Sequence, residues 1–97
     1  MQLNNLSLSE GDKKKIDELL TKYSNNFDFY AFGSRVQGTA KKYSDLDLAY
    51  VIKGENNLFL LEDEIVESDI SITIDFVNLD DISKDFRDLI DEQMLEV

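Results

Sequence analysis

The sequence predicts a small α+β domain built on a mixed β-sheet of three to four strands packed with helices. Three short segments have the apolar composition or the alternation of strands, and segments with a helical spacing of apolar residues lie between them. The chain contains no proline and no Gly/Ser-rich linker, so we expect residues 1–97 to form a single domain. A domain of this size buries only about two-thirds of its unfolded surface, which is consistent with a homodimer or a hetero-oligomer.

The composition excludes several kinds of chemistry. With 10 Lys and Arg against 21 Asp and Glu, the net charge of −11 argues against direct nucleic-acid binding, because clustered cations are needed to neutralise phosphates. DNA mimicry or a basic protein partner stays open. The absence of cysteine and histidine leaves carboxylates, hydroxyls, Lys, Arg or oxygen-bound metals for any catalysis. Because no membrane-length apolar run and no signal-peptide pattern is present, we expect a cytoplasmic protein.

A first helix is predicted after the capping-box pattern of residues 7–10, in which Ser7 and Glu10 would serve opposite backbone donors. The neighbouring lysines lie mostly toward solvent, and the apolar residues close to one helical stripe are Leu8, Ile16, Leu19, Leu20 and Tyr23. The polar residues that follow Tyr23 end the helix.

Two strands flank a glycine turn. Residues 27–32 are short, apolar and aromatic, which predicts a buried strand that stops at Gly33. A short helix is predicted from Ser34 to Gln37 or Thr39, with Gly38 as its weak point or its end, and a polar loop follows. Apolar and polar residues alternate from Asp45 to Ile52, which predicts a strand with two acids at one end.

A crossover helix over residues 58–67, capped by Asn57, leads to the third strand. The apolar run at its start, residues 58–61, exceeds what a small core buries. Alternation from residue 70 to residue 77 predicts the third strand, which carries Asp75 among apolar neighbours.

The chain is expected to end with a helix and a short strand. The helix begins at Asn78 or Asp80, with acids in its first turn. The tail, residues 94–97, adds a short strand. The predicted buried stripe of the helix consists of Ile82, Phe86, Leu89, Ile90 and Met94.

The stretch from Gly33 to Asp47 combines the requirements of nucleotidyl transfer. Gly33 lets the backbone approach a ligand closely, and the helix start at Ser34 offers free N–H groups to a phosphate. Asp45 and Asp47 point to one face of a strand roughly 6.5 Å apart, near enough to bind one divalent cation. Each feature alone is most often a plain turn or a surface acid. Their conjunction at this spacing arises by chance on the order of a few times per thousand chains.

Asp75 would supply a third carboxylate if its strand lies beside that of Asp45 and Asp47. An unpaired acid in so apolar a strand is costly, and a bound cation would relieve that cost. Three converging carboxylates can hold two Mg²⁺ ions about 4 Å apart, one at the attacking hydroxyl and one at the leaving pyrophosphate. A calcium-binding EF-hand is excluded, because Tyr50 and Asn56 occupy its required glycine and glutamate positions.

Together these residues resemble a known family. The pattern Gly33-Ser34, ten residues, Asp45-x-Asp47 and a later Asp75 is similar to that of the polymerase-beta-type nucleotidyltransferases. The length resembles the minimal nucleotidyltransferases encoded beside HEPN-domain proteins. The resemblance implies a polymerase-beta-like nucleotidyltransferase fold, and catalytic and metal-binding roles with Mg²⁺ for the three aspartates. It implies nucleotide binding by Gly33, Ser34 and Arg35.

The sequence departs from this family at one position of the turn. Family members commonly read Gly-Ser-Arg-x-Arg-Gly, and Gln37 replaces the second arginine here, so one phosphate or partner contact lacks its usual side chain. Lys42, in a loop with Lys41 and Tyr43, is a substitute phosphate contact, with Tyr43 available to stack on a base. A plain solvated loop is the alternative.

The resemblance implies a Mg²⁺-dependent protein adenylyltransferase that moves AMP from ATP to a tyrosine hydroxyl of a HEPN-domain toxin, and so acts as its antitoxin. Two alternatives stay open. One is a binding module that neutralises a partner by stoichiometric complex formation, which the net charge and the apolar run of residues 58–61 motivate. The other is transfer to a small molecule such as an aminoglycoside, although no second domain is evident to build an acceptor pocket.

Overall fold

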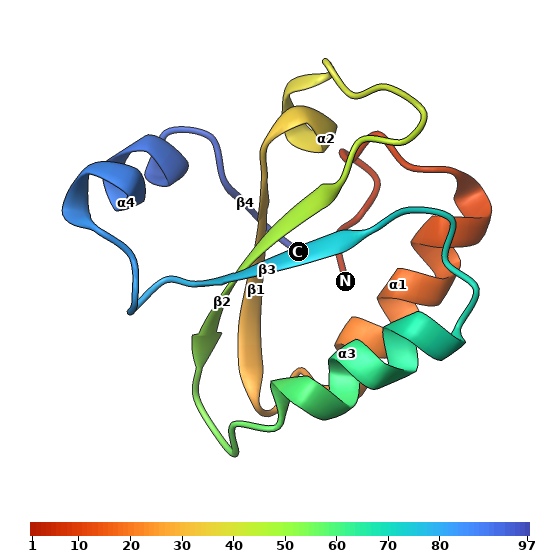
Figure 1. Ribbon diagram of the computed structural model, residues 1–97, viewed down its shortest axis with the longest axis horizontal. Coiled ribbons are helices and arrows are strands. Elements are labelled where there is room, and N and C mark those ends of the chain that lie inside the picture. The colour runs from red at the N-terminus through yellow and green to blue at the C-terminus, as the bar shows by residue number, and fades with distance from the viewer.

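The structure is a computed structural model that describes all of residues 1–97, and helices alternate with strands along the chain (Figure 1). The first half contains α1 (Glu10–Lys22), β1 (Phe27–Phe32), α2 (Ser34–Gln37) and β2 (Leu46–Ile52). The second half contains α3 (Leu58–Glu67), β3 (Ile74–Asn78), α4 (Lys84–Asp91) and β4 (Leu95–Glu96). The α+β class and the bounds predicted for β1 and α3 are confirmed, and α2 ends at Gln37, the earlier of its two predicted ends. None of the helices combines the length and apolar composition that a membrane crossing requires.

The four strands form one mixed sheet in the order β3-β2-β1-β4. β1 runs antiparallel to both β2 and β4, whereas β2 and β3 are parallel. A parallel pair cannot be joined by a tight turn, so the chain crosses over through α3 between these two strands. β3 and β4 are the two edges of the sheet, and the tail contributes the predicted short strand.

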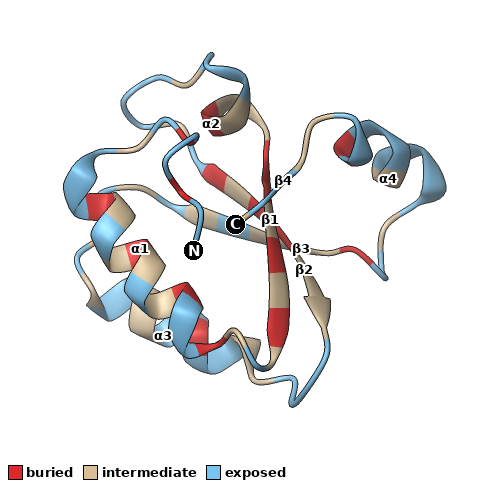
Figure 2. Ribbon diagram, turned by 180° about the vertical axis from the view of Figure 1, so that it is seen from behind, coloured by how far each residue is buried: buried red, intermediate tan, exposed pale blue.

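One face of the sheet packs on α1 and α3 to form the main core. Side chains alternate between the two faces of a strand, so every second residue of β1 and β2 points toward these helices. Figure 2 shows buried segments on the central strands and on the helix surfaces that face them. The buried strand residues are Phe27, Phe29, Ala31, Leu46 and Leu48, and the helices add Ile16, Leu20 and Leu61.

The opposite face of the sheet carries a smaller apolar cluster and is only partly covered. Phe32 and Ala49 pack there with Leu79 and with Ile90 of α4. α4 lies to one side of the strands (Figure 1), and its Phe86 and Leu89 are 39% and 56% exposed. The predicted buried stripe of this helix is therefore wrong at these two positions, because the cluster on this face is too small to cover them.

The predicted cap of α1 is wrong, and the predicted cap of α3 is at the right residue but makes no side-chain capping bond. The N-cap of α1 is Ser9, whose Oγ accepts a hydrogen bond from the Asp12 N–H at 3.2 Å. Ser7 is unavailable for this role, because its backbone is hydrogen-bonded to α2. Asn57 does precede α3, but its Oδ1 accepts from Asn26 Nδ2 at 2.9 Å and leaves the helix N–H groups uncapped.

β3 begins later than the alternation of the sequence predicts. Before Ile74 the chain bonds to α1, because Asp12 accepts from the Ser71 N–H at 3.1 Å and from the Ser71 Oγ at 2.5 Å. These bonds, with one from Ser9, lower the pKa of the Asp12 carboxyl although its burial opposes that shift. Asp12 therefore anchors the approach to β3 onto the first turn of α1.

The last helix also begins later than predicted. α4 starts at Lys84, and the Ser83 Oγ caps it by accepting from the Phe86 N–H at 3.2 Å. Of the two predicted starts, Asn78 pairs with β2 as the last residue of β3, and Asp80 lies in the connecting turn.

Leu61 and Leu60 offer a matched test of which side of α3 faces the core. Leu61 is fully buried, whereas Leu60 is 44% exposed. We expect Leu61→Ala to lower the free energy of unfolding by about 2–5 kcal/mol, because it removes buried methyl groups and leaves a cavity. Leu60→Ala should lower it by less than about 1 kcal/mol. Urea unfolding measures both values, and equal losses would contradict this packing.

Candidate active site

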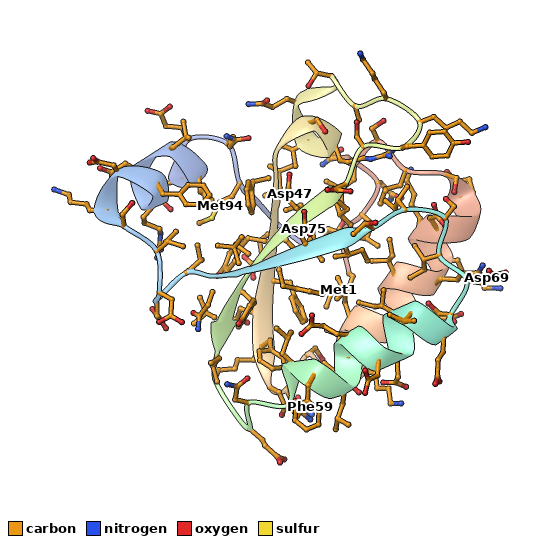
Figure 3. All side chains as sticks on the ribbon, in the orientation of Figure 1. Met1, Asp47, Phe59, Asp69, Asp75 and Met94 are labelled. Atoms are coloured by element: carbon orange, nitrogen blue, oxygen red, sulfur yellow. The ribbon has the colours of Figure 1, made fainter.

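Asp47 and Asp75 are neighbours across two parallel strands. Each is the second residue of its strand, and the register of β2 and β3 pairs them directly. Residues paired in this way point to the same face of a sheet, and Figure 3 shows the two side chains close together. Asp45 lies immediately before β2. The expectation that the strand of Asp75 lies beside that of Asp45 and Asp47 is confirmed.

Negative charge accumulates at this point of the sheet. Burial raises the pKa of the Asp47 carboxyl, and repulsion from Asp75 and Asp45 raises it further. Partial desolvation, a hydrogen bond with Asp45 and repulsion from Asp45 raise the pKa of the Asp75 carboxyl. Carboxylates that oppose one another's ionisation in this way would be stabilised by a bound cation.

The environment of Asp75 differs from the one expected. The predicted strand was apolar enough to bury this acid, but β3 is an edge strand and the side chain is exposed on the uncovered face of the sheet. Burial in an apolar strand is therefore not what marks Asp75 as a ligand. Its proximity to Asp45 and Asp47 is the observation that does so.

The donor set of the three aspartates fits a hard divalent cation. Carboxylate oxygens are the protein ligands that Mg²⁺ prefers, and their mutual repulsion favours taking up positive charge. No group of three acidic side chains is already arranged around a common metal position, so these side chains would have to turn toward a shared ion. Asp45, Asp47 and Asp75 are thus the candidate metal ligands.

Gly33 brings the turn after β1 into contact with Asp47. Its φ of 83° and ψ of −159° are open only to glycine, and a Cβ added at this position would overlap the Asp47 Oδ2 atom. The Gly33 carbonyl accepts from the Val36 and Gln37 N–H groups, both at 3.1 Å, which starts α2. Ser34 opens this helix, where the first N–H groups have no partner within it. The turn predicted to hold phosphates therefore lies next to Asp47.

Arg35 does not face this turn but points into the protein. Its buried guanidinium donates five hydrogen bonds of 2.7–3.2 Å, all to backbone carbonyls. Because these carbonyls use its donors, the structure gives Arg35 a different role from the expected phosphate contact. It ties the N-terminal segment and the loop before β2 to α2. The accepting carbonyls belong to Ser7, Lys41, Lys42 and Ser44.

Lys42 is exposed on the loop that Arg35 holds. Its Nζ lies 5.4 Å from the centroid of the Tyr43 ring. The residue lines an open groove of about 410 Å³ with Ser9, Asp12 and Ser71, and no hydrogen bond or ion pair joins it to the three aspartates. The phosphate contact expected of Lys42 stays a prediction.

Gln93 is a site residue that the sequence did not indicate. The Gly33 N–H donates to Gln93 Oε1 at 2.9 Å, so the tail of the chain touches the turn beside Asp47. The two residues are 60 positions apart, and a single glutamine after a helix belongs to no motif. The pairing of β4 with β1, which the sequence predicted only as a short added strand, carries Gln93 to this position.

Removing one carboxylate should stabilise the metal-free protein. A carboxyl with a raised pKa in the folded state costs stability as the pH rises, because the unfolded chain releases the proton first. We expect Asp47→Asn to raise Tm by about 4–8 °C, or about 1 kcal/mol, near neutral pH. The gain should fade as the pH falls toward 3.8, the ordinary aspartate value.

Calorimetry in the absence of divalent cations, at neutral and acidic pH, measures this gain. Asp28→Asn is the matched control. The Asp28 carboxylate pairs with Lys53 Nζ at 3.0 Å, so the control should not gain stability at neutral pH. A lower Tm for Asp47→Asn than for the wild type at neutral pH would contradict the repulsion.

Arg35→Lys should destabilise the loop before β2. Lysine cannot reproduce the fork of guanidinium hydrogen bonds, so we expect a loss of about 2–4 kcal/mol in the free energy of unfolding. Faster tryptic cleavage at Lys41 and Lys42 should accompany this loss. Arg87→Lys is the control, because it changes only an exposed pair with Asp91 at 3.0 Å and should cost less than about 0.5 kcal/mol. Equal losses of stability for the two variants would contradict the role of the Arg35 hydrogen bonds in holding the loop before β2.

Comparison with known proteins places this chain in a family. The family described as "Polymerase beta, Nucleotidyltransferase" matches residues 14–95. A relative from Haemophilus influenzae, named "Probable protein adenylyltransferase MntA", is 45% identical over 69 residues. The aligned region covers 67% of this chain and 60% of the relative, so the chain spans less than two thirds of that protein's length.

Solved structures share the fold. One chain of a toxin–antitoxin complex crystallised with AMP-PNP superposes with a TM-score of 0.65 at 25% identity, over 87% of this chain and 70% of that one. A minimal nucleotidyltransferase superposes with a TM-score of 0.69 at 18% identity, over 94% and 99% of the two chains. These matches confirm the predicted fold. With its family match over residues 14–95, the chain belongs to the polymerase beta nucleotidyltransferase family.

Proposed function

We propose that the protein transfers AMP from ATP to a tyrosine hydroxyl of a HEPN-domain toxin, in a Mg²⁺-dependent reaction, and thereby acts as the antitoxin. The observation that carries the proposal is the pairing of Asp47 with Asp75 beside the Gly33 turn. It combines carboxylates for a divalent cation with backbone donors for a phosphate, which are the two needs of nucleotidyl transfer.

In this reaction the acceptor oxygen bonds to the α-phosphorus of ATP, and the bond from that phosphorus to the bridging oxygen of pyrophosphate breaks. Ser34 and the N–H groups of its turn hold the phosphates. Asp75 is exposed on this face of the sheet, where its carboxylate can accept the proton of the incoming hydroxyl. Asp45, Asp47 and Asp75 would hold two Mg²⁺ ions, which would supply positive charge for the leaving pyrophosphate and for the incoming hydroxyl.

The comparisons support the substrate and the kind of partner. The Haemophilus influenzae relative carries the name of a protein adenylyltransferase. AMP-PNP, which is present in the similar toxin–antitoxin structure, is an analogue of ATP. The choice of a HEPN-domain toxin and a tyrosine acceptor rests on the resemblance of the Gly33–Asp47 motif to the minimal nucleotidyltransferases.

A second candidate function is neutralisation by stoichiometric binding, which the outer surface of α3 favours. Half of the apolar run at its start is exposed, with Phe59 at 62% and Leu60 at 44%. Val66, near the C-terminal end of the same helix, is 83% exposed. This confirms that the run exceeds what the core buries. Acidic side chains surround these residues on α3, so a partner with apolar and basic groups would fit.

Transfer of label from α-labelled ATP to the co-purified toxin tests the enzymatic function. We expect labelling by the wild type with Mg²⁺ and a loss of at least about a hundredfold in Asp45→Asn/Asp47→Asn, because both candidate metal ligands are changed. Glu10→Gln/Glu18→Gln, which removes two exposed charges from α1, is the matched control and should label normally.

Toxin inhibition measured on the same variants separates the two functions. Equally low labelling by the wild type and the double aspartate variant would remove the enzymatic proposal. Full neutralisation by the double variant at an equimolar ratio would favour stoichiometric binding instead.

A further inference from the structure

The C-terminal segment places Gln93 against the proposed nucleotide site. After α4 the Gln93 and Met94 N–H groups both donate to the carbonyl of the buried Ile90, at 3.0 and 2.9 Å. Two residues later β4 pairs with Ala31 and Tyr30 of β1. Gln93 is therefore held from both sides, and its position next to the turn follows from the fold.

The orientation of the Gln93 carboxamide is determined by its partner. A backbone N–H can only donate, so the oxygen atom must be the one that faces Gly33, at 2.9 Å. The Nε2 group then carries two donors, and neither has a hydrogen-bond partner in the protein. The side chain is half-buried and Nε2 is not enclosed, so these donors can reach a ligand.

The Gln93 carboxamide lies at a part of the site that has few free hydrogen-bond donors. A Cβ at Gly33 would overlap the Asp47 Oδ2 atom, so Gln93, which is hydrogen-bonded to Gly33, lies at the turn beside Asp47. Arg35, which the motif predicted for phosphate binding, is turned inward. A neutral double donor here suits an anionic oxygen, and the phosphate of a nucleotide is the anion that the proposed function brings to this turn.

We propose that Gln93 is a nucleotide-binding residue with two contacts. Its Oε1 holds the Gly33 N–H and so positions the turn against Asp47. Its Nε2 donates to a phosphate oxygen of the bound nucleotide. The second contact rests on the proposed function, whereas the first does not depend on it.

Two substitutions separate these contacts. Gln93→Glu keeps an oxygen for the Gly33 N–H but removes both donors and adds a negative charge. It should preserve the slow hydrogen exchange of the Gly33 amide and raise the Kd for AMP-PNP with Mg²⁺ about tenfold or more. Gln93→Met removes the oxygen as well, so Gly33 exchange should accelerate and the Kd should also rise. Gln2→Glu makes the same charge change at an exposed position near α1 and should alter neither value.

Calorimetric titration with Mg²⁺ and AMP-PNP, together with amide exchange followed by NMR, measures both quantities. A Kd for Gln93→Glu within about twofold of the wild type would overturn the phosphate contact. Unchanged Gly33 exchange in Gln93→Met would overturn the positioning contact. If the wild type and Gln2→Glu fail to bind AMP-PNP while Gly33 exchange responds as expected, the proposed function and the phosphate contact fail and the positioning contact stands.

Discussion

The parallel pairing of β2 with β3 is the constraint on which the rest of this small fold depends. Parallel neighbouring strands require a crossover connection, and α3 forms this connection between β2 and β3. Together with α1, α3 then covers one face of the sheet. The same pairing aligns Asp47 with Asp75 on the other face. One arrangement of two strands thus sets both the core and the repulsive cluster of acids.

The two faces of the sheet have different tasks. The face toward α1 and α3 contains the large apolar cluster and supplies most of the packing. The other face has a small cluster around Phe32 and Ile90 and leaves the acids open. Because α4 covers only part of it, the Asp75 side chain stays exposed on this face. The stability lost to the acids is offset by packing on the far side of the same strands.

Much of this fold could be predicted from local patterns, because alternation and turn glycines report directly on backbone structure. The strand before Gly33, the short helix after it and the acids at the start of β2 follow from such signals. Contacts between residues far apart in the chain could not be predicted from local patterns in the sequence. Ser71 meets Asp12 through tertiary packing, and this contact shortens the strand that alternation predicted. The family motif predicted that Arg35 contacts the phosphates. The direction of its side chain depends instead on backbone carbonyls of other segments of the chain. Gln93 reaches Gly33 only because β4 pairs with β1.

The inward position of Arg35 has a consequence for the dynamics of the site. The Arg35 guanidinium donates to carbonyls of two segments, the N-terminal stretch and the loop before β2, and its own backbone belongs to α2. Detachment of either segment would remove hydrogen-bond partners from a buried charge, so we expect these segments to open together. The loop that precedes Asp45 is consequently not a free lid. We expect its local unfolding to be coupled to that of the turn that faces Asp47, because Arg35 belongs to the helix that follows this turn.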